Sequence, residues 1–206
     1  MRKHHRGISL DGLSKYYDLM TPAERSKFRQ TQIALSGVRS GERVLDVGCG
    51  TGALTIPARI AAGEAGAAAG IDIAPNMIAT ARQKAKKLGL DIDFRVASID
   101  DLPYPDGHFN LVLSSLMFHH LPVAVKEKGL REIHRVLKPQ GRFFLSDFMT
   151  PHPLTAALMF LLLIWMGSTR YQLFGKLPAL IKSCGFSTPE AVAKGAFLTY
   201  YRITKA

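Results

Sequence analysis

From about residue 43 the sequence alternates short β-like runs with amphipathic helical stretches, and this alternation restricts the fold more than any other feature. Residues Pro75–Leu88 place their apolar side chains on one face at helical spacing, with Gly89 as a stop. Strand–helix alternation is typical of βαβ units and predicts a largely parallel sheet. The strands that we expect are Arg43–Val47, Ala67–Ile73, Ile92–Ala97, Phe109–Leu116 and Arg142–Phe148, with a second helix over Val123–Leu137.

A glycine-rich loop follows the first expected strand, with the sequence Asp46-Val47-Gly48-Cys49-Gly50-Thr51-Gly52-Ala53. Ligands of open parallel sheets bind beyond the carboxyl ends of the strands, so this loop is a candidate binding site. Gly48, Gly50 and Ala53 satisfy the dinucleotide fingerprint, which keeps NAD as an alternative. Asp46 would repel a pyrophosphate, whereas S-adenosylmethionine has no phosphate and carries an ammonium and a sulfonium. The loop therefore favours S-adenosylmethionine over NAD, and a turn that only connects strand to helix is the remaining alternative.

A second acid, Asp72, ends the second expected strand. Acids at this position hydrogen-bond ribose hydroxyls in NAD and S-adenosylmethionine proteins alike. The residue therefore indicates an adenosine ligand without choosing between the two. The structural alternative is that Asp72 only caps the helix that follows.

Five motifs occur in order along the chain, and a Tyr17-Asp18 pair precedes them. At these motifs the sequence resembles the class I S-adenosylmethionine-dependent methyltransferases, most closely the small-molecule branch that includes the ubiquinone/menaquinone-biosynthesis C-methyltransferases. The motifs are Val44-Leu45-Asp46-Val47-Gly48-Cys49-Gly50-Thr51-Gly52, Gly70-Ile71-Asp72-Ile73-Ala74-Pro75-Asn76-Met77, Asp101-Leu102-Pro103-Tyr104-Pro105-Asp106-Gly107-His108-Phe109, Phe118-His119-His120-Leu121 and Arg131-Glu132-Ile133-His134-Arg135-Val136-Leu137-Lys138-Pro139.

The resemblance implies an α/β fold: a Rossmann-like, seven-stranded, mostly parallel sheet with helices on both faces and an antiparallel last strand. Ala196–Thr204 would form that strand. Residues 1–40 would form an N-terminal helical cap and residues 41–206 the methyltransferase domain, with an apolar helical insertion or lid at about 151–175.

The resemblance also implies a division of labour in binding S-adenosylmethionine, from which S-adenosylhomocysteine would be the product. Asp46, Gly48 and Gly50 would face the methionine part, and Asp72 the ribose. The loop that begins at Ser98 would hold the adenine. The full set of cofactor-binding residues that we expect is Asp46, Gly48, Gly50, Thr51, Asp72, Ile73, Met77, Ser98, Ile99, Asp100, Ser114 and His119.

Three positions depart from the pattern of the family. Ser98 stands where the family often has an acid that contacts the adenine amino group, and a hydroxyl can still accept that hydrogen bond. Asn110 and Gln140 replace an Asp and a Gly on the expected surface. The Asn-Pro-Pro-Tyr signature of methylation on adenine or glutamine nitrogen is absent after the fourth strand, which argues against those acceptors.

The expected catalysis is direct methyl transfer, in which positioning of donor and acceptor can account for roughly 7–11 kcal/mol of the barrier. A general base is needed only if the acceptor must lose a proton. His119 and Tyr17 are the candidates, with His120 and Asp147 on the same side of the sheet. Paired histidines at the end of a strand are often structural, and Tyr17 could instead close over the cofactor.

The net charge of +11 is concentrated at the two ends of the chain. Residues 1–43 carry 9 Lys and Arg against 4 acids, and residues 148–206 carry 6 against 1. The second of these segments includes an apolar run, Leu154–Met166, which is too short to span a bilayer. The run is either a buried helix or a lid that contacts a greasy acceptor or an anionic membrane surface.

These features predict a small, hydrophobic or lipid-like acceptor and a cytoplasmic enzyme with peripheral contact to a membrane. An RNA methyltransferase is one alternative, although the basic residues are dispersed and form no known RNA-binding module. A non-catalytic S-adenosylmethionine- or NAD-binding protein is the other. The two cysteines, Cys49 and Cys184, have no metal-like spacing, so we expect neither a metal site nor a disulfide framework.

Overall fold

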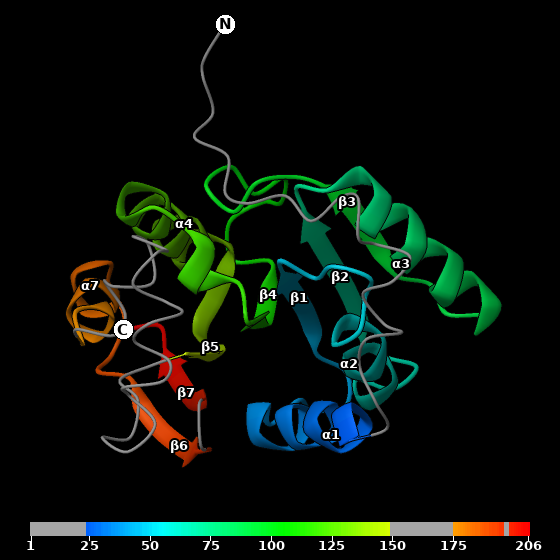
Figure 1. Cartoon of the computed structure of the whole chain (residues 1–206), viewed down its shortest axis with the longest axis horizontal. Coiled ribbons are helices and arrows are strands. Elements are labelled where there is room, and N and C mark those ends of the chain that lie inside the picture. The colour runs from blue at the N-terminus through cyan, green and yellow to red at the C-terminus, as the bar shows by residue number, and fades with distance from the viewer. Residues whose placement is uncertain (1–23, 149–174, 196–197) are drawn as a thin grey trace, which may run out of the picture.

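The computed structural model describes residues 24–148, 175–195 and 198–206, and within them one seven-stranded sheet organises the fold (Figure 1). The strand order is β3-β2-β1-β4-β5-β7-β6. β7 pairs antiparallel with both β5 and β6, and the remaining neighbours pair parallel. The strands are β1 (Arg43–Val47), β2 (Ala67–Asp72), β3 (Asp93–Val96), β4 (Phe109–Ser115), β5 (Leu137–Phe148), β6 (Glu190–Lys194) and β7 (Leu198–Thr204).

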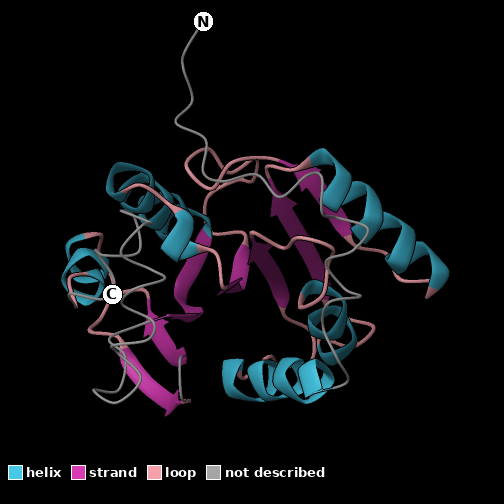
Figure 2. Ribbon diagram, in the orientation of Figure 1, coloured by secondary structure: helices cyan, strands magenta, loops and turns pink. Residues whose placement is uncertain are grey.

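Helices cover both faces of the sheet (Figure 2). On one face lie α1, α2 and α3, and on the other lie α4 and α7 (Figure 1). A short 3₁₀ turn, η2 (Phe118–His120), follows β4. The α-helices are α1 (Glu24–Ser36), α2 (Thr55–Ala61), α3 (Pro75–Lys87), α4 (Val123–Val136) and α7 (Leu177–Ser183). Among the described residues, no helix has both the length and the hydropathy that crossing a membrane requires.

The central strands are apolar on both sides because both sides are covered. Val44 of β1 packs in the cluster beneath α1 and α2, whereas its neighbour Leu45 packs in the cluster beneath α4 and α7. On β4, Leu111 and Val112 divide between the same two clusters. Successive side chains of a strand point to opposite faces, so continuous apolar runs are what a sheet buried on both faces requires.

Buried polar contacts attach α1 to the sheet. Arg142 of β5 donates hydrogen bonds at 2.7 Å to each carboxylate oxygen of Glu42, and it also donates to Gly37 O. Burial alone would raise the pKa of Glu42, but the bonds from Arg142 and the Arg39 backbone outweigh it and lower the pKa. Gln32 of α1 is only 1% exposed and lies inside this interface. These contacts fix the position of α1, whose side chains line the site described below.

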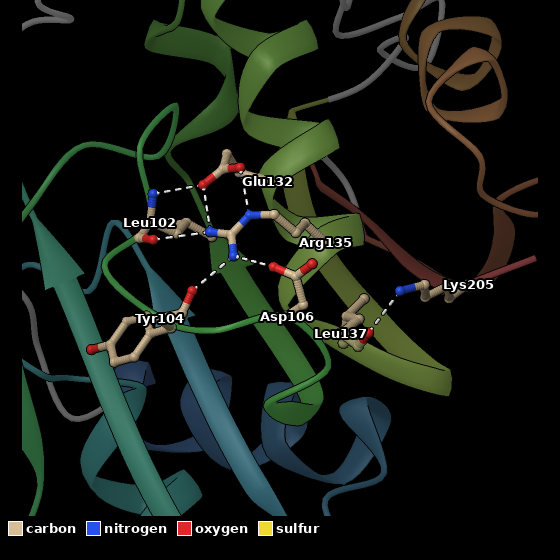
Figure 3. Close-up of polar contacts among 7 residues, drawn as sticks. All are labelled: Leu102, Tyr104, Asp106, Glu132, Arg135, Leu137 and Lys205. Atoms are coloured by element: carbon tan, nitrogen blue, oxygen red, sulfur yellow. Dashed lines mark hydrogen bonds and ion pairs between the residues drawn. The ribbon is translucent and has the colours of Figure 1, made fainter.

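Arg135 of α4 holds the loop between β3 and β4 (Figure 3). Its guanidinium donates to Leu102 O at 3.0 Å and to Tyr104 O at 2.8 Å, and it forms ion pairs with Asp106 and Glu132. Glu132 in turn accepts a bond from Leu102 N at 2.9 Å. The planar guanidinium has five donors in a fixed fork and can bond all four residues at once, whereas a lysine has only three donors. This cluster accounts for the Leu-Pro-Tyr-Pro-Asp and Glu-Ile-His-Arg motifs as one structural unit.

The fold predicted from the sequence is confirmed: a Rossmann-like α/β domain with a mixed seven-stranded sheet and an antiparallel last strand. Two details were wrong. β6 was not expected, and β5 begins at Leu137 rather than Arg142, so that α4 passes directly into it. Gln140 takes a φ of +60° within this early part of β5. Tyr17, most of the proposed 1–40 cap and the Leu154–Met166 run lie outside the described residues.

Candidate active site

A cavity of about 430 Å³ opens beyond the carboxyl ends of the parallel strands, where the fold places ligands. One half is walled by the glycine-rich loop after β1, the end of β2 and the start of α3. We call this the loop half. The other half is walled by α1, the β4–η2 connection and Leu198 of β7. We call this the helix half.

The glycine-rich loop of the loop half needs glycine for its backbone path. Gly48, Gly50 and Gly52 have φ values of +75°, +52° and +77°, a region that costs other residues roughly 1–2 kcal/mol. Gly48 N and Cys49 N both donate to Ile71 O at 2.9 Å, which ties the loop to the end of β2. A Cβ on Gly48 would lie 2.5 Å from Met117 Cγ, so the residue also meets the helix half at its closest point.

Asp46 is a buried carboxylic acid on the wall of the loop half, 2% exposed. Thr55 Oγ1 donates to its Oδ2 at 2.6 Å. Burial raises the pKa of Asp46 to about 7; the Thr55 bonds oppose this rise and the charge of Asp72 adds to it. Near neutral pH the group therefore gains a full negative charge when a cation approaches it, and an anion would meet repulsion.

Asp72 joins the loop half to the start of α3. Its Oδ2 accepts the Gly50 N–H and its Oδ1 accepts the Ala74 N–H, both at 2.9 Å. The second bond is the helix-start role that was the structural alternative for this residue, and the first holds the glycine-rich loop. A carboxylate oxygen can accept more than one hydrogen bond, so holding the loop is compatible with accepting bonds from ligand hydroxyls as well.

Side chains from distant parts of the sequence form the helix half. Phe28, Arg29 and Gln32 come from α1, and Leu198 comes from β7. Gln32 Nε2 donates to Ser115 Oγ at 2.7 Å and to Ser146 Oγ at 2.8 Å, which joins α1 to the ends of β4 and β5. The other lining residues of this half are Ser115, Leu116, Met117, His120 and Leu121.

The two histidines of η2 have different surroundings. His119 is 5% exposed; its Nδ1 lies 2.7 Å from Asp147 Oδ1, and its backbone N–H donates to Asp147 Oδ2 at 3.2 Å. Both contacts turn His119 toward the end of β5, and it is not among the residues that line the cavity. His120 does line the cavity, and its ring centroid is 3.8 Å from that of His119.

The predicted site residues fall into two groups. The structure brings eight of them to the cavity wall, namely Asp46, Gly48, Gly50, Thr51, Asp72, Ile73, Met77 and Ile99. Ser98, Asp100, Ser114 and His119 are not on that wall: Ser98 Oγ donates to Asp100, and Ser114 Oγ donates to Val47 O at 3.1 Å. These four residues shape the segments that line the cavity. Their roles toward a ligand, like that of Tyr17, stay predictions.

Sequence reasoning missed most of the helix half. Phe28, Arg29 and Gln32 belong to a helix with no recognisable motif, and Leu198 comes from a strand expected only for its place in the sheet. Leu116, with a φ of +53°, and Met117 follow β4 in the segment where ligand-contacting loops are expected. Their position after a central strand was the one signal that could have identified them.

Comparison with protein families agrees with this geometry. Residues 44–141 match the family model described as a methyltransferase domain. The matched segment runs from β1 to the start of β5, so it contains the glycine-rich loop, both acids and η2. It does not include α1 or β7, which complete the helix half.

Curated relatives cover a similar stretch. The ubiquinone/menaquinone biosynthesis C-methyltransferase UbiE of Pseudoalteromonas translucida is 38% identical over 136 residues, which are 65% of this chain and 53% of that protein. The protein of the same name from Yersinia enterocolitica is 36% identical over 144 residues, 68% of this chain and 57% of that protein. The chain thus spans little more than half the length of these relatives.

Solved structures share the fold at low identity. A SAM-dependent methyltransferase from Aquifex aeolicus superposes with a TM-score of 0.75 at 20% identity, covering 94% of this chain and 98% of that one. The cyclase SpnF superposes with a TM-score of 0.67, also at 20% identity, covering 87% and 80%. The second likeness shows that this fold alone does not determine the reaction.

Proposed function

We propose that this chain, which carries a class I S-adenosylmethionine-dependent methyltransferase domain, transfers a methyl group from S-adenosylmethionine to a small hydrophobic acceptor. The observation that carries the proposal is Asp46, a buried acid with a pKa of about 7 at the end of β1, beside a glycine-rich loop that would otherwise suit a phosphate. The sequence match over residues 44–141 and the relatives named as C-methyltransferases support it.

The loop half fits S-adenosylmethionine better than a dinucleotide. Burial is the main cause of the raised pKa of Asp46, and repulsion by the charge of Asp72 adds to it. An ammonium group placed between the glycine-rich loop and Asp46 relieves that repulsion, whereas a pyrophosphate increases it. The residues present therefore accommodate a cationic amino-acid moiety joined to an adenosine.

In this proposal Asp46 and the backbone of Gly48 and Gly50 bind the methionine part, and Asp72 accepts hydrogen bonds from the ribose hydroxyls. Met77 and Ile99 supply apolar surface for the adenine. When bound, S-adenosylmethionine supplies a methyl group on a positively charged sulfur, which a nucleophile displaces in line. The contribution of the chain is to hold the acceptor opposite that methyl group and to exclude water, because positioning supplies much of the rate.

The acceptor would occupy the helix half, where Phe28, Leu116, Met117, Leu121 and Leu198 form an apolar wall. The two relatives are named for C-methylation in ubiquinone and menaquinone biosynthesis. We therefore propose a carbon atom of a quinone-like ring as the acceptor atom. The apolar run Leu154–Met166, the Tyr17-Asp18 pair and a peripheral membrane contact extend this proposal to a lipid-like acceptor and rest on the sequence alone.

The test is transfer of a methyl label. The protein is incubated with methyl-labelled S-adenosylmethionine and a bacterial lipid extract, and the products are partitioned between organic and aqueous phases. We expect label in the organic phase, lost in Asp46→Asn and retained in Asp91→Asn, which neutralises an exposed acid remote from the cavity. Absence of S-adenosylmethionine binding by calorimetry would refute the proposed function.

A further inference from the structure

We propose that His120 hydrogen-bonds a hydroxyl group of the acceptor, so that the helix half selects hydroxylated aromatic molecules over their unhydroxylated analogues. This inference rests on the proposed function, because it places the acceptor in the helix half while the cofactor fills the loop half. It assigns to His120 the acceptor contact that sequence reasoning gave to His119.

The first argument is the position of the ring. His120 lies on the cavity wall at the end of η2, directly after the β4 connection. Its Nδ1 is buried and has no hydrogen-bond partner within the described part of the chain. A buried nitrogen without a partner costs about 1–3 kcal/mol, so an arrangement of this kind calls for a reason. A ligand group that pairs with the imidazole supplies that reason.

The second argument is what surrounds the ring. Leu116, Met117 and Leu121 line the cavity close to it in sequence, and they offer no strong hydrogen-bonding group from their side chains. Across the helix half, Gln32 and Ser115 already bond to each other. The hydroxyl of an aromatic ligand in this half could therefore hydrogen-bond to His120, whose Nδ1 has no hydrogen-bond partner among the described residues.

The third argument is the charge of the ring. The titratable groups that face it are His119 on the same turn, Asp147 at the end of β5 and Lys126 of α4. Burial lowers the pKa of His120 to about 4; the charges of His119 and Lys126 add to this shift and Asp147 opposes it. The ring is thus neutral near pH 7, with one donor and one acceptor nitrogen. That pair matches an uncharged hydroxyl, which can accept a hydrogen bond from one nitrogen or donate one to the other.

The neighbouring pair holds η2 in place. Asp147 is fully buried and accepts both the backbone N–H and the ring contact of His119. His119 therefore acts as a positioning residue, fixing the turn from which His120 extends. The Nδ1 atom of His120, by contrast, has no hydrogen-bond partner within the described residues.

The experiment compares two probes that differ by one hydroxyl, 1-naphthol and naphthalene, titrated by fluorescence at pH 7 into protein saturated with S-adenosylhomocysteine. We expect the wild type to bind 1-naphthol roughly tenfold more tightly, since a site built for a hydroxyl rejects the analogue that lacks it. His120→Phe should reduce that ratio to about one. His120→Asn, which keeps a donor and an acceptor, should restore part of it.

His108→Phe is the matched control, because His108 lies outside the cavity, beside Arg43 and Tyr104. It should leave the probe ratio unchanged. Wild-type protein that binds S-adenosylhomocysteine but binds the two probes equally, or binds neither, overturns the inference and leaves the proposed function standing. An unchanged ratio in His120→Phe overturns it equally. Failure to bind S-adenosylhomocysteine overturns the proposed function and, with it, the inference.

Discussion

The two halves of the cavity are built in different ways. The loop half comes from short segments, residues 46–54, 71–77 and 97–99, and its glycine-rich loop is fixed by backbone N–H groups that bond to Ile71 O and to Asp72. The helix half gathers residues from α1, the β4–η2 connection and β7, and Gln32 joins it through side-chain bonds that span 83 and 114 residues. A site formed by backbone groups depends on the path of the main chain and tolerates few substitutions. A site formed by side chains can change by substitution of one residue at a time.

Gly48 is where the halves touch, so Gly48→Ala should have the largest effect. The new Cβ would lie 2.5 Å from Met117 Cγ and 2.9 Å from Met117 Cβ, at a φ of +75° that alanine rarely adopts. Either the glycine-rich loop or the Met117 segment must move. We expect S-adenosylhomocysteine affinity, measured by calorimetry, to fall about 100-fold, since small misplacements at a built site are costly.

Gly89→Ala separates this clash from backbone strain. Gly89 has a φ of +66°, but its added Cβ would meet nothing within 4 Å, and it follows α3 away from the cavity. This variant should lose about 1 kcal/mol of stability and keep its ligand affinity. Equal loss of affinity in the two variants would show that Met117 plays no part.

Asp46→Asn should have the next largest effect, because it removes the negative charge of the loop half while keeping the shape. We expect about 30-fold weaker binding of S-adenosylhomocysteine at pH 8, in the range of a lost charge-assisted hydrogen bond. Binding of 5′-methylthioadenosine, which has no amino-acid part, should change less than twofold. Equal losses for both ligands would place Asp46 at the adenosine instead.

The same variant has a predictable pH dependence. The unfolded chain ionises Asp46 near its usual pKa of 3.8, whereas the folded chain does so near 7. Between pH 3.8 and pH 7 the folded state holds a proton on Asp46 that the unfolded state has lost. The stability of the wild-type protein therefore falls as pH rises through this range. Asp46→Asn removes this pH dependence, because the amide does not ionise. Between pH 4 and pH 8 the ligand-free wild type should therefore lose about 4 kcal/mol of stability that Asp46→Asn does not lose, measured by urea unfolding.

Asp72→Ala should weaken both ligands equally, and by less than Asp46→Asn weakens S-adenosylhomocysteine. It removes the acceptor of the Gly50 and Ala74 N–H groups and the proposed ribose contact together. We expect about tenfold weaker binding of both S-adenosylhomocysteine and 5′-methylthioadenosine, with about 1–2 kcal/mol of lost stability. Asp72→Asn, which keeps one acceptor oxygen, should be intermediate. A variant that binds 5′-methylthioadenosine normally would leave Asp72 with the helix-start role alone.

The contrast between the halves also explains what the sequence could predict. The loop half was predictable because glycines at positive φ and acids at strand ends are local requirements, readable within ten residues. Leu116 and Gln32 carry no such local signature, since their role depends on how α1 packs against the ends of β4 and β5. The sequence could not show which histidine lines the cavity for the same reason, because His119 is turned toward β5 by Asp147, 28 residues away.

The sheet shows the same limit. Arg43–Val47 and Phe109–Leu116 were predicted to within a residue because their runs are apolar on both faces. Glu190–Lys194 was missed because its sequence, Glu-Ala-Val-Ala-Lys, shows no strand pattern and it forms a strand only by pairing with β7 at the sheet edge. Edge strands depend on tertiary context more than on propensity.

Gln32 forms the helix-half contacts that are furthest apart in the sequence. Its substitution should have the smallest effect on cofactor affinity. Gln32→Leu leaves the Ser115 and Ser146 hydroxyls without this donor, which should cost about 1–3 kcal/mol of stability. S-adenosylhomocysteine affinity should stay within about twofold, because the backbone bonds of the loop half are untouched, whereas 1-naphthol affinity should fall about threefold as α1 loosens. Calorimetry and fluorescence titration measure the two affinities on one preparation. If both affinities fall together, the two halves of the cavity are coupled and do not bind their ligands independently. If only the 1-naphthol affinity falls, the acceptor site can vary while the cofactor site is kept.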